Sequence, residues 1–176
     1  MEKSTSQWSA LINEFQKLIS RVTSAIETDD EIGTVLRLHL LIEEALDAFV
    51  QEKREGDIAV IVRQPRDFGM KLSLATAFGL PVEFGLVIRK INAIRNNLAH
   101  ARSDELVDND IRELARLANK LSNVVCGFVV LEERSLEWSQ RKLAFGKHGN
   151  RIDFIIVVFA LFEAYIRWNK DIIERA

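Results

Sequence analysis

Apolar residues recur every three or four positions through most of this chain, which is the spacing of an α-helix. Among its 176 residues there are only two prolines and eight glycines, the residues that most often interrupt helices. With 48% hydrophobic residues, the chain can bury one core but is too short for two comfortable domains. The pattern therefore predicts one all-α domain over residues 1–176, a bundle of about five or six helices.

Capping and turn residues divide the pattern into segments. We expect helices over residues 4–27, 28–53, 68–78, 81–100, 110–133 and 150–174. Residues 28–31 have the spacing of a capping box, which favours a helix start there. Pro81 suits the first turn of the fourth helix, and Asp110 and Asn150 are typical caps for the last two.

Three other segments are less regular in sequence. Residues 57–67 are expected to form a loop or a short helix, because an isolated strand there would have nothing to pair with. The basic stretch 134–149 is expected to be irregular. The last helix is apolar on several faces, so it is either the central helix of the bundle or a subunit interface.

The helix over residues 81–100 carries an arginine on its apolar side. In a helical projection, Arg95 falls on the inward track beside Ile88. A guanidinium on such a track is costly unless it is paired. We therefore expect either that Glu43 or Glu44 meets Arg95, or that the stripe opens onto a polar cleft or a partner chain.

A histidine follows at the end of the same helix. His100 lies five residues after Arg95, about 140° round and roughly 7.5 Å along an unbroken helix. Asn96 shares the face of His100, since the two are four residues apart. Arg95 and His100 can serve one phosphate only if the helix ends or kinks near Leu98, or if a second copy of the chain brings its own pair alongside.

Residues 95–100, Arg-Asn-Asn-Leu-Ala-His, resemble the Arg-x4-His motif of the HEPN superfamily. That superfamily consists of small helical bundles, many of them dimeric endoribonucleases that cleave RNA without a metal. The resemblance implies that His100 moves a proton, Arg95 stabilises charge on the phosphoryl oxygens and Asn96 holds the geometry. It also implies a homodimer that acts on RNA with no cofactor and no metal. A toxin or defence role is one option for such a nuclease, but the sequence does not specify it. The single cysteine and the lack of a signal-peptide region predict a cytoplasmic protein.

A wider stretch, residues 38–117, is similar to the mannitol operon repressor and related families. In that group the residue after the arginine tends to be acidic, whereas here it is Asn96, which favours the nuclease hypothesis. The alternative is a dimeric transcriptional regulator or interaction module that binds a protein partner, such as a regulator or an antitoxin. In that case Arg95 pairs with Glu43 or Glu44, and His100 caps the helix end.

The second helix contains an i, i+4 polar pair, His39 and Glu43, in an apolar setting. As a metal half-site the pair lacks a third ligand at a recognisable spacing. A satisfied structural pair that supports the motif is the favoured interpretation. His39, Glu43 and Glu44 are therefore the candidate supporting residues.

Basic residues gather near the motif, although the formal net charge is only −2. Between residues 84 and 103 there are four basic residues and no acidic one, and residues 134–151 hold five basic residues against Glu137. These runs are either solvated faces or a surface for a phosphate-bearing ligand. Under the second interpretation, Arg89, Lys90 and Arg102 are the candidate nucleic-acid-binding residues.

The remaining features exclude several classes of protein. The single cysteine, Cys126, excludes an intramolecular disulfide, and its apolar neighbours predict a buried structural thiol. The N-terminal residues have no apolar signal-peptide region, which argues against secretion. The most apolar segment, residues 154–162, is too short for a bilayer, so no membrane association is expected.

Overall fold

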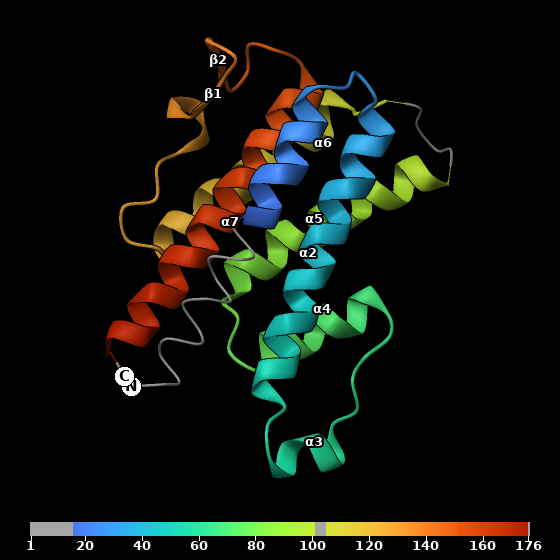
Figure 1. Cartoon of the computed structure of the whole chain (residues 1–176), viewed down its shortest axis with the longest axis vertical. Helices are drawn as coiled ribbons and strands as arrows, with labels where there is room; N and C mark the ends of the chain where they lie inside the picture. The colour runs from blue at the N-terminus through green and yellow to red at the C-terminus, as the bar shows by residue number, and fades with distance from the viewer. Residues whose placement is uncertain (1–15, 101–104, 176) are drawn as a thin grey trace.

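The computed structural model describes residues 16–100 and 105–175, which form a helical bundle with one small β-hairpin (Figure 1). A first helix covers residues 16–26; the start predicted at residue 4 lies outside the described residues. The named helices are α2 (Glu31–Lys53), α3 (Asp57–Ile61), α4 (Phe68–Ala77), α5 (Val82–Ala99), α6 (Asp108–Asn119) and α7 (Asn150–Arg175). The predicted all-α bundle is confirmed, and α3 is the short helix allowed for residues 57–67.

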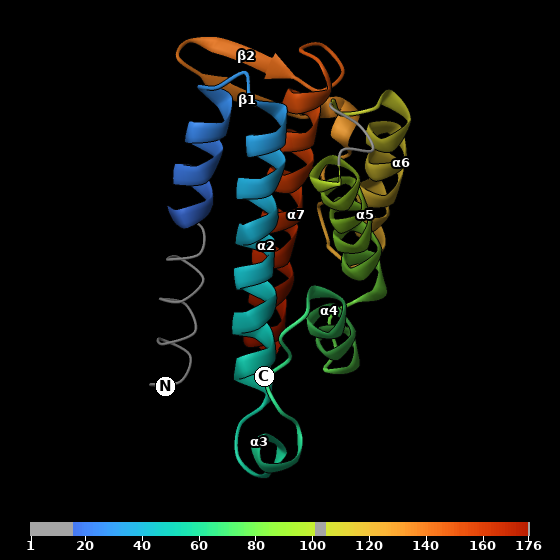
Figure 2. The same ribbon diagram turned by 90° about the vertical axis from the view of Figure 1, so that its right-hand side faces the viewer.

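The helix α7 lies at the centre of the bundle. It runs beside α2 and the helix of residues 16–26 on one side, and α5 and α6 cover its other side (Figure 2). Residues 154–158 are all buried, so this part of α7 is covered all round by the same chain. Of the two alternatives for the last helix, the central position is the one observed.

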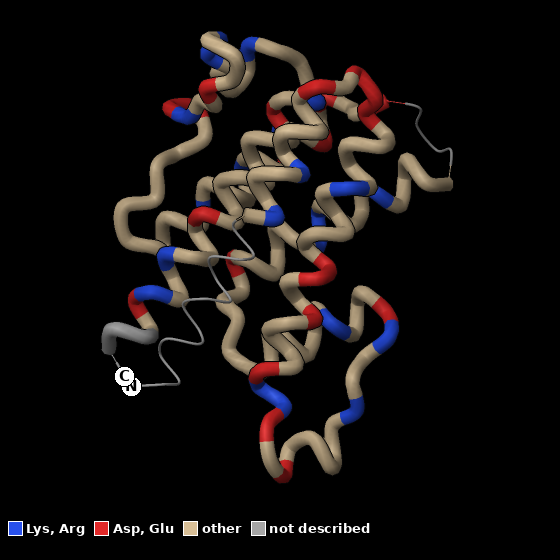
Figure 3. The backbone as a smooth tube through the Cα atoms, viewed as in Figure 1, with Lys and Arg blue, Asp and Glu red and all other residues tan. Residues whose placement is uncertain are grey.

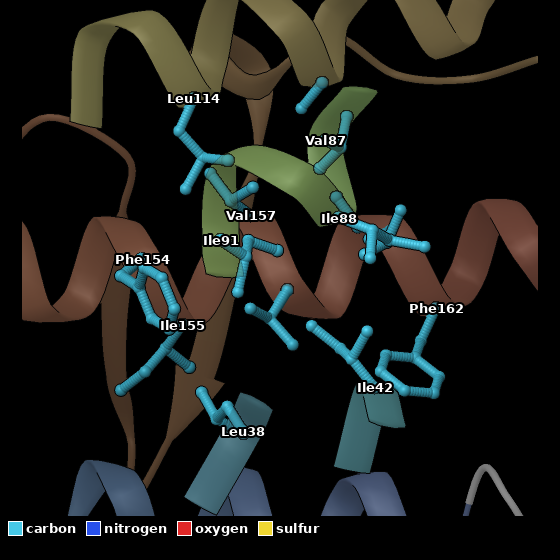
Figure 4. Packing of buried hydrophobic residues seen from close by; sticks show 14 of the residues in the cluster. Leu38, Ile42, Val87, Ile88, Ile91, Leu114, Phe154, Ile155, Val157 and Phe162 are labelled. Atoms are coloured by element: carbon cyan, nitrogen blue, oxygen red, sulfur yellow. The ribbon is translucent and has the colours of Figure 1, made fainter. Parts of the chain in front are cut away.

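The core forms where α2, α5, α6 and α7 meet (Figure 4). Leu38, Ile91, Leu114 and Phe154, one from each helix, are fully buried there. The inward stripe predicted for α5 is confirmed by its buried residues, Phe84, Val87, Ile88, Ile91, Ile94 and Leu98. This stripe fixes which side of α5 faces the core, and thereby where the polar residues of α5 can point.

Two helix starts differ from the prediction by two or three residues. The N-cap of α2 is Asp30, whose Oδ1 accepts a 2.8 Å hydrogen bond from Gly33 N, while Thr28 Oγ1 accepts from Asp30 N. The helix α6 begins at Asp108 rather than with a cap at Asp110. At α2, several short polar side chains compete for the same free N–H groups, which leaves the cap position ambiguous in sequence. At α6 the N-cap is Val107, which makes no side-chain hydrogen bond, so no capping residue marks the start.

The predicted helix over residues 110–133 is wrong in its second half. The helix α6 ends at Asn119 and is followed by 3₁₀ turns at Lys120–Asn123 and Leu131–Glu133. Gly127 takes φ +69°, which a right-handed helix cannot contain. The side chain of Asn119 then holds the returning chain, because its Oδ1 accepts from Leu131 N over 2.9 Å. Cys126 lies in this turn and is exposed, so its predicted burial is wrong as well.

The stretch predicted to be irregular, residues 134–149, contains a β-hairpin. Strands β1 (Ser135–Trp138) and β2 (Arg141–Ala144) pair antiparallel, with Leu136 opposite Leu143. Ser139 and Gln140 form the turn with φ of 45° and 64°, the backbone of a two-residue hairpin loop. The sequence Ser-Gln lacks the asparagine or glycine that usually marks such a turn, so the pattern did not indicate it.

Among residues 16–100 and 105–175, no helix has both the length and the apolar character that crossing a bilayer requires. Basic and acidic residues are interspersed along the helices rather than separated into large patches of one sign (Figure 3). A charged site in the described residues therefore depends on individual side chains.

Candidate functional site

The predicted motif lies at the C-terminal end of α5. The helix is unbroken to Ala99, and His100 is its C-cap, with its backbone N–H bonded to Asn96 O over 3.1 Å. Arg95 and His100 therefore leave the helix in different directions, as five residues of regular helix require. One chain alone does not bring the two side chains together.

The expected ion pair between Arg95 and an α2 carboxylate is not formed. Lys71 Nζ binds Glu43 Oε1 and Arg21 Nη2 binds Glu44 Oε1, each over 2.7 Å. In residues 16–100 and 105–175, no carboxylate forms an ion pair with Arg95. The predicted pairing was wrong because other cations, from α4 and from the helix of residues 16–26, occupy Glu43 and Glu44.

The Arg95 guanidinium instead makes only some of the hydrogen bonds that its N–H groups could donate. Its Nη1 donates to Asn96 Oδ1 over 3.0 Å, and its Nε is buried without a hydrogen-bond partner. A buried donor without a partner is unfavourable, so a ligand oxygen that reached Nε would relieve a cost already present in the fold. The residue that follows the arginine thus has a defined role, since Asn96 holds the guanidinium against the helix.

A histidine and an asparagine meet between α2 and α5. The buried His39 lies with Nε2 3.0 Å from Asn92 Oδ1, and its ring stacks on Phe68 at a centroid distance of 4.5 Å. Burial lowers the pKa of His39, and the charge of Arg95 acts in the same direction against the opposing effects of Asn92 and Glu43. His39 is therefore neutral near pH 7, with Nε2–H as the donor. Its partner is Asn92, so the predicted pairing with Glu43 was wrong, although both residues are satisfied.

A row of polar side chains runs along one side of α5. Asn92, Asn96 and His100 follow one another at intervals of four residues, with Arg95 beside Asn96. The inner end of the row is anchored by His39, whereas His100 is exposed and makes no side-chain hydrogen bond within the described residues. The row therefore leads from a hydrogen bond between α2 and α5 to an exposed imidazole at the end of α5.

The three candidate nucleic-acid-binding residues are in different situations. Arg89 is exposed, and Arg102 lies outside the described residues. Lys90 binds the carboxylates of Asp110, over 2.9 Å, and Glu113. Burial alone would lower the pKa of Lys90, but the hydrogen bonds to both carboxylates outweigh it and raise the pKa. Lys90 therefore ties α5 to α6, and its charge is largely neutralised within the chain.

Three apolar side chains follow one another on α2, the helix that packs against α5. Ile32, Leu36 and Leu40 follow at four-residue intervals on α2, and 53% of Leu40 is exposed. The N-terminal end of α2 lies close to where the chain leaves α5, because Glu31 Oε2 accepts a 2.7 Å hydrogen bond from Leu106 N. We call Ile32, Leu36 and Leu40 the α2 row.

Sequence reasoning missed two residues of this site. Asn92 was detectable, since it precedes Asn96 by four residues and so belongs to the same helical row. Phe68 was not, because its contact with His39 depends on how α4 packs against α2.

No protein-family model, no curated protein and no solved structure matches this chain. No activity can be carried to it from a relative on these grounds.

Proposed function

We propose that this protein is an HEPN-like endoribonuclease that cleaves RNA without a metal, at a site shared between two copies of the chain. The observation that carries the proposal is the state of Arg95. Its guanidinium is held by Asn96 but is paired with no carboxylate of the described residues, and its Nε lacks a partner. A purely structural arginine at this position would be expected to have its charge matched.

The chemistry is that of internal transesterification. The 2′-hydroxyl of RNA attacks the adjacent phosphorus, the bond to the 5′-oxygen breaks, and a cyclic phosphate remains. His100 transfers the proton of the 2′-hydroxyl to the departing 5′-oxygen, a role for which its exposed imidazole is suited. Arg95 stabilises the negative charge that develops on the phosphoryl oxygens, and Asn96 keeps the guanidinium in place.

A second copy is needed because of the helix geometry. Arg95 and His100 diverge around α5 within one chain, whereas a two-fold axis near the end of α5 would bring Arg95 of one copy beside His100 of the other. The α2 row lies on the helix that packs against α5, and its exposed Ile32 and Leu40 supply apolar surface that such a contact would bury. The proposed homodimer therefore contains two equivalent composite sites.

A second candidate function is that of a protein-interaction module, such as a dimeric regulator. It is favoured by α3, which projects from the bundle (Figure 1) and has no buried residue. Val60 and Ile61 are 79% and 82% exposed at its tip. The base of this projection is fixed, because Arg54 Nε donates to Val62 O over 2.7 Å. An ordered, apolar projection is suited to binding another protein.

Cleavage of several RNAs in the presence of a chelator separates the two functions. We expect the parent to release cyclic-phosphate ends under these conditions, and His100→Ala to reduce the rate at least about 100-fold. His148→Ala is the matched control, because it removes an exposed histidine from a loop outside the motif. Cleavage that survives the loss of His100, or that stops with chelator, would overturn the mechanism. Failure of a well-folded parent to cleave any of the RNAs would favour the interaction module.

A further inference from the structure

A cleft lies away from the motif, between α6, the segment after β2 and the start of α7. Its volume is about 540 Å³, and it shares no residue with the polar row of α5. Cavities of roughly 300 to 1,000 Å³ are typical of small-molecule sites. The cleft is therefore large enough for an organic ligand and far larger than a single small ion needs.

One wall of the cleft carries two unpaired arginines. Arg112 and Arg116 are four residues apart on α6, so they share one side of that helix. Both are exposed, and neither makes a hydrogen bond or an ion pair with another residue of the described ranges. Two guanidiniums so arranged offer several N–H donors to one oxyanion.

The carboxylates around the cleft are already engaged by protein donors. Asp108 Oδ1 accepts a 2.7 Å hydrogen bond from Asn150 Nδ2. Glu132 accepts from Asn119 Nδ2, over 2.9 Å at Oε2. These donors are neutral amides, so the carboxylates keep their charge. An anionic ligand is therefore expected at Arg112 and Arg116, whose N–H groups are free donors in the cleft.

The start of α7 adds further donors at the floor. This helix begins at Asn150, and its first turn faces the cleft through Gly149, Asn150 and Asp153. Only from Asp153 onward, whose N–H bonds Gly149 O over 3.1 Å, do its amides have partners within the helix. The positive end of a 26-residue helix thus points at the same space as the two arginines.

Asp153 shapes the floor of the cleft. It is only 7% exposed, and its Oδ1 accepts a 2.7 Å hydrogen bond from Gly146 N, which fixes the segment after β2. Burial raises the pKa of Asp153, and the effects of Gly146 and His148 oppose this rise. Asp153 therefore takes up a proton at a higher pH than an exposed aspartate does. Its Oδ2 has no hydrogen-bond partner among the described residues, and can interact with a polar group of a ligand. Phe145 and Ala115 supply the apolar part of the wall.

We propose that this cleft binds a small organic phosphate, with the phosphoryl group between Arg112 and Arg116 and the organic body against Phe145. The site is separate from the composite site proposed for RNA cleavage and does not depend on it. The ligand class follows from the free donors, which match phosphoryl oxygens, and from the volume, which leaves room for more than the phosphoryl group.

Isothermal titration of the full chain tests this site. The probes are adenosine 5′-monophosphate and glucose 6-phosphate, with adenosine, glucose and inorganic phosphate as comparison ligands. We expect at least one of the two esters to bind, and Arg112→Ala with Arg116→Ala together to weaken that binding at least about tenfold. Arg63→Ala removes an exposed arginine in the α3–α4 connection, away from the cleft, and should leave the affinity unchanged.

Several outcomes would overturn the proposal. These are the failure of both esters to bind the parent, equal binding by the parent and the double variant, and binding of adenosine or glucose as tight as that of its ester. Inorganic phosphate that binds as tightly as either ester would also contradict it, because the organic body would then contribute nothing. Since both arginines are exposed, unfolding of the double variant is not expected, and circular dichroism checks this. His100→Ala should bind the esters like the parent, which separates this site from the cleavage site.

Discussion

His39 on α2 and Asn92 on α5 are joined by a hydrogen bond of 3.0 Å between Nε2 and Oδ1. The bond lies at the inner end of the polar row that leads to His100, so it couples the position of α5 to α2. Because Asn92 offers its oxygen, His39 has to donate, and it can do so as a neutral imidazole. The lowered pKa of His39 agrees with this state.

Stability should therefore depend on the protonation of His39. The pKa of His39 is lower in the folded chain than in the unfolded chain. Below about pH 6.5, the folded chain therefore binds fewer protons at this histidine than the unfolded chain does at the same pH. The contribution of His39 to the free energy of unfolding should be fully present above that pH. Below it, the free energy of unfolding should fall by at most about 1.4 kcal/mol per pH unit because of this group. Urea unfolding between pH 7.5 and 5 should show a smaller acid loss in His39→Gln than in the parent. His100→Gln, which changes an exposed histidine, should keep the parental slope; equal slopes in all three proteins would contradict the assignment.

Lys71 should stabilise the contact of α4 with α2. Its Nζ lies 2.7 Å from carboxylate oxygens of both Glu43 and Asp47, and the lysine is buried. Lys71→Met keeps the apolar stem but leaves two neighbouring carboxylates unpaired. Since both carboxylates are partly exposed to water, we expect a loss of about 1 to 3 kcal/mol rather than the full cost of a buried charge. Lys142→Met, on the exposed face of β2, is the control and should stay within about 0.5 kcal/mol of the parent.

Arg95→Ala should cost little stability. A buried ion pair with Glu43 or Glu44 would make this substitution cost roughly 3 to 5 kcal/mol. The structure shows only one hydrogen bond, to Asn96, and an unsatisfied Nε, so we expect about 1 kcal/mol. Chemical unfolding of Arg95→Ala beside the parent measures this difference. A loss above about 3 kcal/mol would indicate a structural role and would favour the interaction module.

Leu40→Glu should separate the proposed dimer. Leu40 is exposed in one chain, so a glutamate there is tolerated in the monomer, but burying its charge in an interface would be costly. Sedimentation at micromolar concentration should show a dimer for the parent and a 20.1 kDa species for the variant. Ile61→Glu, at the tip of α3, is the control and should remain dimeric. A parent that sediments only as a monomer would rule out the shared site.

The helical architecture was predictable because it is carried by local signals. The inward stripe of α5, with Ile91 and Leu98, follows from periodicity alone and is confirmed. The hairpin of residues 135–144 was not predictable, since Ser139 and Gln140 adopt positive φ without the residues that usually mark it. The early end of α6 depends on the contact of the Asn119 side chain with Leu131 N, twelve residues later.

The residues of the candidate site were predicted, but their partners were not. The helical pattern of apolar residues in α5 contains three polar residues that stand out in the sequence: Arg95, Asn96 and His100. Which cation reaches Glu43 is decided by the packing of α4 on α2, where Lys71 lies closer than Arg95. Ion pairs between distant segments follow from tertiary structure, and no local pattern specifies them.

The most direct test of the shared site is cleavage by a mixture of two inactive variants. Arg95→Ala and His100→Ala, co-expressed with different tags, form mixed dimers in which one composite site keeps both an intact Arg95 and an intact His100. Random pairing makes about half of the dimers mixed, each with one of two sites intact, so we predict about one quarter of the parental RNA cleavage activity. Each variant alone should be inactive. If the mixture is as inactive as its components while the parent cleaves RNA, then Arg95 and His100 do not act across two chains and the central claim is contradicted.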